Sequence, residues 1–515
     1  MTTITRRTFT AATTSLMASA SPVRKLELRL QTRDAADRLV ITTETVDPGR
    51  IGIVAIDTWD WHWCMTATQR VGALVPRMNA AVEGARRLGM PIFWAPTDVA
   101  DYHAAMPQRQ RAIAVPRVAV PKFKALPNCF RFKVVEGVCL CGPGIPCEGR
   151  FDWEGMNPGL VVAPGDYITK GIEELYSLSK QKGLTHLIYI GVHTNICVFS
   201  RAEGLRNLAP LGFRCMLARD LHDAQTKYDP KTGFTPDQGT AGIAADMESA
   251  GIPTINLGDQ MREAGVWDER QIADTVRITP WGTKARPYLF ASPFAVTLTA
   301  PWLDGAQIRY TLDAQDPHAG SELYRNPLEV AQETSVRAAA FRNGRRVSLV
   351  AGGYFARLAP MPPKPQVHLD DLLQPLSPGD ARAMRIGQAY SGGPLTMRER
   401  QYSHGIGVCA PAHIVLPLKP EYQRFVALVG IDDDVQRKHE HAYYQGVHSC
   451  VQFRVFIDGN LAAESPVMHL LQEPWRFDVK IPAASWVIAL VASGAAGRSL
   501  YDVGNWADAG FLREG

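Results

Sequence analysis

Continuous apolar runs alternate with segments of helical period between residues 51 and 260. IGIVAID (51–57), PIFWAP (91–96) and HLIYIGV (186–192) lack the polar alternation of a half-exposed strand, which is typical of strands that a parallel sheet buries on both faces. Over 71–85, apolar residues recur at helical spacing. This rhythm predicts an α/β three-layer sandwich, with a mostly parallel sheet between two layers of helices.

From about residue 288 the pattern changes to short β-like runs separated by Pro, Gly and Asp. These runs predict a small all-β sandwich over 288–358. The proline-rich stretch MPPKPQ (361–366) is a natural boundary, and β-like runs return over 366–513. We therefore expect a multidomain chain, with an α/β domain over 40–262 and two β-sandwich domains after it.

Composition and charge narrow the classes of partner. The 515 residues include 55 Lys and Arg and 51 Asp and Glu, a formal net charge of +4. This balance gives no electrostatic signature of nucleic-acid binding. No apolar run approaches the roughly 18 residues of a membrane span. The sequence predicts neither a nucleic-acid partner nor a membrane span.

The N-terminal segment, residues 1–20, has an export-like pattern. Arg6 and Arg7 precede a mildly apolar stretch that ends in Ala18, Ser19 and Ala20. Paired arginines, a weak hydrophobic region and an A-x-A site resemble a twin-arginine signal, which implies a periplasmic or extracellular protein. A disordered tail is the alternative.

Two residues with chemical potential stand at the ends of predicted strands. Asp57 closes the first strand and Cys197 follows the strand 186–192. Active sites of parallel sheets lie at the carboxyl ends of the strands, so both side chains are expected at one edge. The start of a helix near Cys197 favours a thiolate there. The alternative is that Cys197 fills the core as a small hydrophobe.

The segments IVAIDTW (53–59), PGDYITK (164–170) and IGVHTNICV (190–198) together resemble the isochorismatase-like cysteine hydrolases, which include nicotinamidases and N-carbamoyl amidohydrolases. The resemblance covers about residues 40–262. It implies an amidase that needs no cofactor and acts through a covalent thioester.

The resemblance also implies a role for each matching residue. Asp57 accepts the thiol proton, Lys170 stabilises the thiolate, and Cys197 attacks the carbonyl carbon. A cis peptide bond just before His193 would turn backbone N–H groups toward the substrate oxygen. The catalytic site would then include an oxyanion hole formed around His193, Thr194 and Cys197.

The chain departs from the family pattern beside Lys170, which runs almost directly into the helix GIEEL (171–175). A solvated lysine at the start of a helix is therefore an alternative for Lys170. Three lysines of the long segment before it are candidate substitutes: Lys122, Lys124 and Lys133.

Aromatic residues after the first strand are expected to wall the substrate pocket, or to form an oligomer interface: Trp59, His62 and Trp63, with Trp61 between them. An Asp-x-His element (Asp60 to His62) follows the first strand, whereas the metal-binding element of nicotinamidases follows the second, so no catalytic metal is predicted. Three clustered cysteines lie in a Gly- and Pro-rich segment and could form a metal clip, a disulfide or an ordinary loop: Cys139, Cys141 and Cys147.

The C-terminal half carries two further resemblances. IRYTLD (308–313) followed by SELY (321–324) resembles the immunoglobulin-like domain at the end of chitobiases and hexosaminidases. QYSHGIGVCAPAHIVLPL (401–418) and NWADAGF (505–511) resemble the NPCBM carbohydrate-binding module, a jelly-roll (galactose-binding-like) sandwich, over 366–513. A glycan is therefore an expected partner.

The predicted module contains candidate ligand-binding residues. Four aspartates could hold calcium, although a solvated acidic turn explains the consecutive three equally well: Asp432, Asp433, Asp434 and Asp508. Three aromatic residues are candidates for sugar contact: Tyr443, Tyr444 and Trp506.

These expectations combine into one functional hypothesis with one alternative. The leading hypothesis is an exported cysteine hydrolase that cleaves an amide-type C–N bond of a small molecule and carries a glycan-targeting C-terminal half. The alternative is an inactive hydrolase-like scaffold that binds carbohydrate. Pocket walls in this family often come from a neighbouring subunit, so a homo-oligomer is an option. The sequence does not identify the substrate or the glycan.

Overall fold

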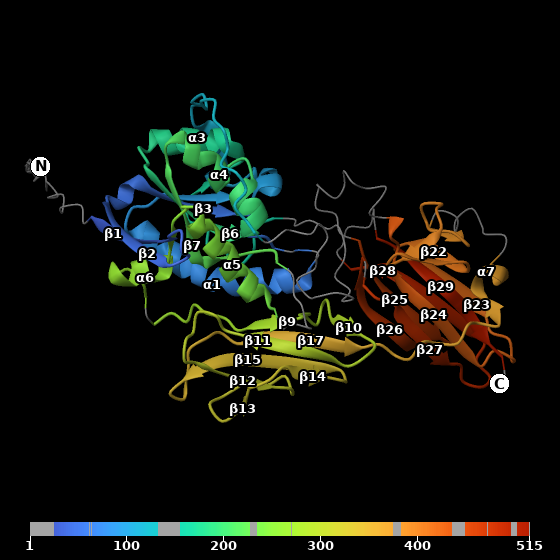
Figure 1. Cartoon of the computed structure of the whole chain (residues 1–515). Coiled ribbons are helices and arrows are strands. Elements are labelled where there is room, and N and C mark those ends of the chain that lie inside the picture. The colour runs from blue at the N-terminus through green and yellow to red at the C-terminus, as the bar shows by residue number, and fades with distance from the viewer. Residues whose placement is uncertain are drawn as a thin grey trace, which may run out of the picture.

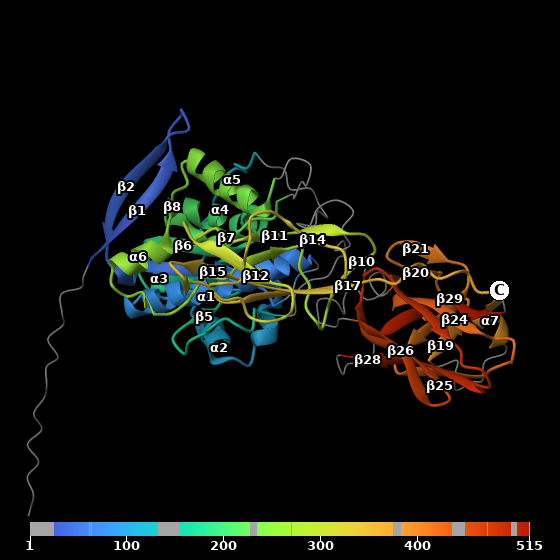
Figure 2. The same ribbon diagram turned by 90° about the horizontal axis from the view of Figure 1, so that it is seen from below.

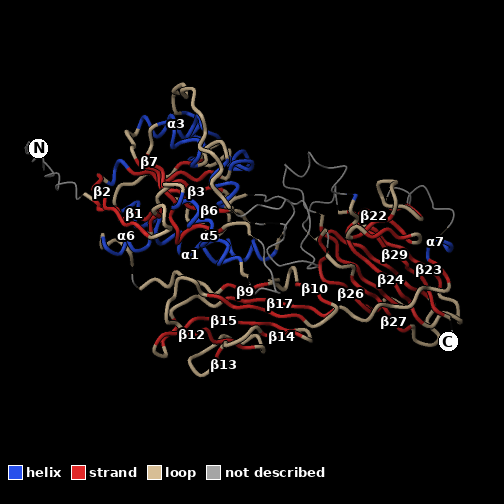
Figure 3. The backbone as a smooth tube through the Cα atoms, viewed as in Figure 1, coloured by secondary structure: helices blue, strands red, loops and turns tan. Residues whose placement is uncertain are grey.

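The computed structural model describes residues 25–60, 62, 64–131, 155–226, 234–268, 270–373, 383–434, 449–470, 472–495 and 502–513. Helices gather in the N-terminal part of the chain, and strands dominate the rest (Figures 1 and 3). The predicted multidomain architecture, an α/β domain followed by antiparallel β-sandwiches, is confirmed. No helix among the described residues has both the length and the apolar character needed to cross a membrane.

The α/β domain is built on an eight-stranded sheet in the order β2-β1-β8-β7-β6-β3-β4-β5. Its six central and edge strands from β3 onward run parallel: β3 (Ile51–Ile56), β4 (Ile92–Ala95), β5 (Tyr167–Ile168), β6 (His186–Val192), β7 (Arg214–Asp223) and β8 (Thr254–Ile255). An antiparallel hairpin, β1 (Leu26–Arg33) and β2 (Leu39–Val46), extends the sheet at one edge (Figure 2). The sequence did not predict this hairpin.

Alternate residues of β3 show why the sheet needs helices on both faces. Ile53 packs in the core beside α1 (Met65–Arg87) and α6 (Leu257–Glu263). Val54 points the other way, into the core formed with three other helices: α3 (Gly171–Gln181), α4 (Leu205–Leu208) and α5 (Pro236–Ser249). Because successive side chains of a strand point to opposite faces, an unbroken apolar run gives two cores.

The second domain is a two-sheet sandwich in which β14-β11-β9 faces β10-β17-β15-β12-β13. Its strands are β9 (Arg277–Thr279), β10 (Tyr288–Phe290), β11 (Phe294–Thr299), β12 (Gln307–Thr311), β13 (Glu322–Leu323), β14 (Leu328–Val330), β15 (Thr334–Arg342), β16 (Arg345–Arg346) and β17 (Ala351–Arg357). Val296 and Leu298 of one sheet meet Val336 and Phe355 of the other in a shared core. Alternation along each strand therefore forms an aligned sandwich.

The third domain pairs the sheet β19-β22-β29-β24-β27 with the sheet β23-β28-β25-β26. Its elements are β18 (Val367–His368), α7 (Leu369–Leu372), β19 (Met384–Ile386), β20 (Leu395–Met397), β21 (Arg400–Tyr402), β22 (Gly405–Cys409), β23 (Ala412–Pro417), β24 (Arg424–Ile431), β25 (Cys450–Ile457), β26 (Asn460–His469), β27 (Trp475–Lys480), β28 (Val487–Gly494) and β29 (Val503–Leu512). Trp506 lies at the centre of the core, with its ring centroid 5.2 Å from that of Phe453. Its assignment to sugar contact is therefore wrong, since the side chain is only 1% exposed.

Gly191 is required where β3 and β6 approach one another. Its φ is +120°, and a Cβ atom built there would lie 2.0 Å from the carbonyl oxygen of Ile56. Real side chains never approach backbone so closely, so only glycine fits. This contact sets the distance between the ends of the two strands.

We expect Gly191→Ala to reduce the free energy of unfolding by more than about 3 kcal/mol, because it combines a steric clash with an unfavourable φ. Gly212→Ala is the matched control, since Gly212 has φ +92° but open space around its Cα. It should cost only about 1 kcal/mol. Equal losses for the two variants in denaturant unfolding would show that the close approach to Ile56 is not the constraint.

Candidate functional site

Asp57 and Cys197 meet at the carboxyl edge of the parallel sheet. Strands β3 and β6 are neighbours, with Ile56 paired to Gly191. Asp57 follows β3 directly, and Cys197 lies in the π-helical turn η3 (Thr194–Val198) that follows β6. The Cys197 thiol lies close enough to the Asp57 carboxylate for the two groups to interact electrostatically. The predicted juxtaposition of these two residues is present in the structure.

The Asp57 carboxylate is buried and held by a cation. Its side chain is inaccessible to solvent, and its Oδ2 accepts a hydrogen bond from Arg201 Nε at 3.0 Å. Its φ is +48°, an unusual value for a residue other than glycine and one that clusters at functional sites. The backbone at Asp57 therefore adopts a strained conformation, which directs this carboxylate toward Cys197.

The Cys197 thiol is protonated in this arrangement. Burial and the neighbouring charge of Asp57 raise the pKa of Cys197 well above its ordinary value, whereas Arg201 acts in the opposite direction. This shift opposes the thiolate expected from a helix start, and that expectation stays a prediction. A thiol in this state must give up its proton as it attacks, and Asp57 is the base in contact with it.

Arg201, not Lys170, is the cation in contact with Asp57. Lys170 is the N-cap residue of α3, and its Nζ pairs with Asp101 at the surface, where the Lys170 side chain is 45% exposed. The helix starts immediately after Lys170, so its side chain diverges from the strand edge. Lys122 and Lys124 are exposed, and Lys133 lies outside the described residues.

The four-residue spacing between Cys197 and Arg201 is a sequence signal for this cation, and the sequence-based prediction did not include it. Arg201 follows Cys197 by four residues, and the Arg201 N–H donates to the Cys197 carbonyl at 3.0 Å, which makes one helical turn. Residues four apart on a helix share a face, so an arginine there reaches the same carboxylate as the cysteine.

The cis peptide bond expected before His193 is absent. Among the described residues, the cis bonds precede Pro280 and Pro411. The His193 carbonyl instead accepts three N–H groups, from Ile196, Cys197 and Val198, at 3.0, 2.7 and 3.2 Å. The Cys197 N–H is thus already used within the π-helical turn, a form that often marks functional sites. An oxyanion hole that includes this N–H requires the His193 carbonyl to move.

Three rings pack against one another beyond the ends of β3 and β6. Trp59 stacks on His62 with ring centroids 4.8 Å apart, and its ring meets His193 edge-on at 4.7 Å. Burial and the positive charge of Arg70 lower the pKa of His193 to about 3, so its imidazole is neutral at physiological pH. His193 Nε2 is buried and has no hydrogen-bond partner among the described residues. These rings form a largely apolar wall. Trp63 lies outside the described residues.

The turn that carries Cys197 is anchored to the end of β7. Thr194 Oγ1 donates to the Asp223 carbonyl at 3.0 Å and lies 2.7 Å from His222 Nδ1. The side chain of Asn195 exchanges two hydrogen bonds with the backbone of Gln225, at 2.9 and 3.0 Å. Thr194 therefore positions the turn, and no described contact gives it a direct chemical role.

A buried ionic network holds Asp223, the residue at the end of β7 to which the turn carrying Cys197 is anchored. Arg70 of α1 donates from Nε to Asp223 at 3.0 Å, and its guanidinium lies 2.8 Å from Asp237. Arg277, from β9 of the second domain, also pairs with Asp237. Burial raises the pKa of Asp237, but the two guanidiniums together outweigh this and hold it below its ordinary value. The second domain thus supplies one cation to the network beneath the site.

The acidic run of the third domain is buried, so its interpretation as a solvated turn is wrong. Asp432, Asp433 and Asp434 are 1%, 5% and 7% exposed. Asp433 accepts hydrogen bonds from the backbone N–H groups of Arg398 and Glu399, at 2.9 and 2.7 Å. The Asp433 carboxylate therefore stabilises the turn at Arg398 and Glu399. Calcium binding by the three aspartates and Asp508 stays a prediction.

Several sequence-based predictions lie outside the described residues. They concern the export segment 1–20, the cysteines 139, 141 and 147, and the aromatic pair Tyr443 and Tyr444.

Two family models match the C-terminal half of the chain. Residues 289–351 match the chitobiase/beta-hexosaminidase C-terminal domain, and residues 366–512 match the NPCBM/NEW2 domain. Both resemblances predicted for this half are therefore confirmed. None of the curated proteins matches the sequence.

Solved structures resemble separate parts of the chain at low identity. A cysteine hydrolase from Pseudomonas syringae pv. phaseolicola is 12% identical, covering 42% of this chain and 95% of its own (TM-score 0.26). An isochorismatase family protein from Burkholderia thailandensis is 14% identical, covering 38% and 96% (TM-score 0.21). The CBM51-2 and INT domains of Clostridium perfringens ZmpB are 23% identical (TM-score 0.24), covering 39% of this chain, and this chain spans only 39% of that protein.

We expect Arg201→Leu to slow alkylation of Cys197 by iodoacetamide about tenfold at neutral pH, because the thiolate and Asp57 lose their nearest positive charge. Lys170→Met is the control and should leave the rate unchanged, since Lys170 pairs with Asp101 at the surface. Mass spectrometry of the Cys197 peptide measures both rates. The reverse ranking of the two variants would return the cationic role to Lys170.

Burial of neutral His193 predicts that the α/β domain is acid-sensitive. The unfolded state binds the proton near pH 6.5 and the folded state only near pH 3, so the free energy of unfolding falls as pH drops below about 6.5. From pH 7 to pH 5, this group should remove about 2 kcal/mol.

His193→Phe should lose that share of the pH dependence in denaturant unfolding of the α/β domain. His413→Ala changes an exposed histidine of the third domain and should retain it all. Undiminished pH dependence in His193→Phe would mean that His193 is not held neutral.

Proposed function

We propose that the α/β domain is a cysteine hydrolase that cleaves an amide-type C–N bond of a small molecule through a thioester on Cys197. The observation that carries the proposal is the arrangement at the sheet edge: a thiol beside a buried carboxylate that interacts with it electrostatically, and an arginine, Arg201, paired with that carboxylate. A nucleophile in contact with its base, which a third group orients, is the signature of covalent catalysis.

In the proposed reaction, Cys197 Sγ attacks the carbonyl carbon while its proton passes to the Asp57 carboxylate. The tetrahedral intermediate collapses as the C–N bond breaks and Asp57 returns the proton to the leaving amine. Water then attacks the thioester while Asp57 accepts one of its protons. The tetrahedral intermediate collapses as the C–S bond breaks, Asp57 returns this proton to the Cys197 sulfur, and the carboxylic acid is released. Arg201 keeps Asp57 ionised and oriented in the resting enzyme. The neutral ring of His193 and the rings of Trp59 and His62 suit a flat, uncharged substrate.

A second candidate is a scaffold without catalytic activity. Cys197 is only 6% exposed, and its N–H is bound to the His193 carbonyl. The two candidates differ in one physical respect: the enzyme must open this turn when substrate binds, whereas the scaffold keeps it closed.

We propose that the third domain directs the chain to a glycan outside the cytoplasm, with the twin-arginine-like segment as its export signal. The match of residues 366–512 to the NPCBM/NEW2 model supports the carbohydrate-binding role. The second domain then acts as a spacer between the α/β domain and the module.

The decisive experiment incubates the full chain with a panel of primary amides and N-carbamoyl compounds and measures released ammonia. Hydroxylamine added during turnover should trap the acyl group as a hydroxamate. Cys197→Ala should abolish both signals. Cys215→Ala should reduce neither below about one third, because Cys215 is buried in β7 away from Asp57.

Ammonia release that survives Cys197→Ala would exclude the thioester mechanism. Absence of any adduct between Cys197 and chloroacetamide-type amide analogues, in a chain that still binds them, would favour the scaffold.

A further inference from the structure

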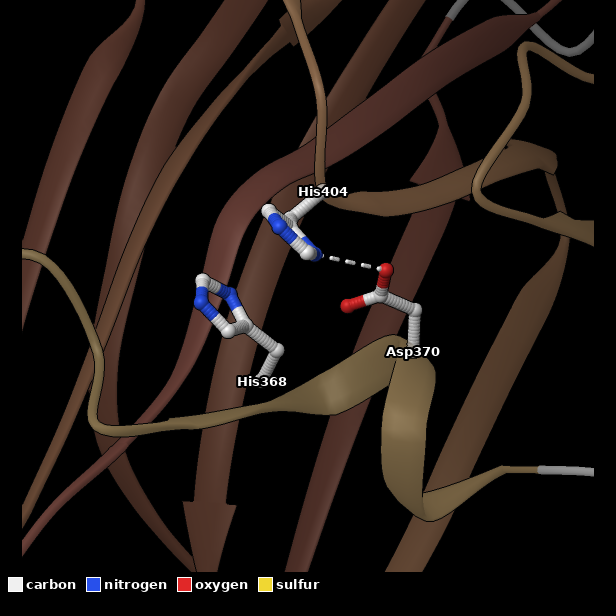
Figure 4. Close-up of side chains that lie close together, drawn as sticks. All are labelled: His368, Asp370 and His404. Carbon is white, nitrogen blue, oxygen red and sulfur yellow. Dashed lines mark hydrogen bonds and ion pairs between the residues drawn. The ribbon is translucent and has the colours of Figure 1, made fainter.

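Three metal-ligating side chains converge at the start of the third domain (Figure 4). His368 ends β18, Asp370 lies in α7, and His404 lies in the turn between β21 and β22. The candidate ligand atoms of all three lie within 4.8 Å of one another. Neither the hydrolase chemistry nor the family matches accounts for this cluster.

The contacts within the cluster leave two polar atoms unmet. His404 Nδ1 lies 3.1 Å from Asp370 Oδ2, and the two imidazole rings stack with centroids 3.8 Å apart. His368 Nδ1 and Asp370 Oδ1 are buried and have no hydrogen-bond partner among the residues that the structure describes. Asp370 as a whole is 8% exposed. A buried carboxylate oxygen and a buried ring nitrogen without partners are costly, unless a further group binds both.

We propose that His368, Asp370 and His404 form a binding site for a divalent transition metal ion, with Zn²⁺ as the best-fitting member of the class. Two imidazoles and one carboxylate make a mixed nitrogen and oxygen set, which suits Zn²⁺. Ca²⁺ requires six to eight oxygen ligands, which these residues do not offer.

The geometry is close to that of a three-ligand zinc site with a water molecule in the fourth position. Ligand atoms about 2.1 Å from a tetrahedral ion lie about 3.4 Å apart, whereas these atoms lie within 4.8 Å of one another, so the widest separation must shrink by up to about 1.4 Å. Side-chain rotation of the two imidazoles is the movement that binding would require. The His404 side chain is 40% exposed, which leaves a route for the ion from solvent.

The position of the cluster indicates what the ion does. His368 and Asp370 belong to the first residues after the proline-rich linker, whereas His404 leads into β22. β18 is a two-residue strand, held to β29 by the pairs Val367↔Phe511 and His368↔Gly510. An ion bound to all three ligands would lock this short strand and α7 onto the sheet. The metal therefore has a structural role, fixing where the linker enters the third domain.

The test uses the full chain after removal of metal with EDTA. Equilibrium dialysis against Zn²⁺, with metal quantified by mass spectrometry, should show one more equivalent bound by the wild type than by His404→Ala or Asp370→Ala. Each substitution should weaken this site at least about 100-fold. His413→Ala removes an exposed histidine of β23 and serves as the control with unchanged stoichiometry.

A second readout separates metal binding from a folding defect. Zn²⁺ should raise the melting temperature of the third domain in the wild type and in His413→Ala, but not in His404→Ala, whose metal-free melting temperature should stay close to that of the wild type. Co²⁺ in place of Zn²⁺ should give the visible spectrum of a four-coordinate site. Equal Zn²⁺ stoichiometry and equal melting shifts in wild type and His404→Ala would overturn the proposal. Cys197→Ala should bind the ion normally, so failure here is distinct from failure of the hydrolase reaction.

Discussion

The ion pair between Arg70 and Asp223 is the interaction on which the candidate active site depends. Asp223 ends β7, and its backbone carbonyl receives the Thr194 hydroxyl while its carboxylate receives Arg70. The turn that presents Cys197 is therefore fastened to a residue that α1 fixes in place. Removing one partner of such a buried pair typically costs about 3–5 kcal/mol, since the other charge stays buried and uncompensated. Such a change would also disturb the position of Cys197, because the turn that carries Cys197 is anchored to Asp223.

This network also joins the first two domains. Arg277 of β9 pairs with Asp237, which Arg70 contacts from the other side. β9 is at the same time a strand of the second domain, paired with β11. Arg77 of α1 lies over the ring of Trp302 from the second domain as well, 5.6 Å from its centroid. The second domain therefore supplies a buried positive charge, Arg277, to two aspartates close to the candidate site, Asp237 and Asp223.

The features that depend on local hydrophobic patterns and on the order of strands could be predicted from the sequence. The fully apolar run of β3 implies burial on both faces, and the order of strands then brings Asp57 and Cys197 to one edge. In the hairpin β1–β2, only β1 alternates between buried and exposed residues and could have been predicted. The β2 strand could not, since Leu39 and Ile41 are each 55% exposed and leave it almost no buried face. The burial of Trp506 could not be predicted, because the sequence around a tryptophan in a β-strand does not show whether its side chain faces a core or a sugar-binding surface.

The errors at the candidate site have a different origin. Lys170 and Arg201 both lie near strand ends at the sheet edge where Asp57 is found. Which of the two cations pairs with Asp57 depends on where the neighbouring helix begins. A helix that starts at Gly171 turns Lys170 outward, whereas a turn that starts at Thr194, before Cys197, places Arg201 one turn later on the same side. A displacement of a few residues in a helix start changes which cation a buried carboxylate meets. Such displacements are below what local patterns determine.

The same limit explains why the histidine cluster was not apparent in the sequence. Thirty-four residues separate Asp370 from His404, a spacing that corresponds to no metal-binding motif. They meet because both flanking segments pair with one strand: His368 is opposite Gly510, and the His404 carbonyl accepts the N–H of Asp508. β29 therefore brings the cluster together, as β3 and β6 bring Cys197 and Asp57 together. In both places, long-range strand pairing decides which side chains meet, and the local sequence decides only which side chains are available.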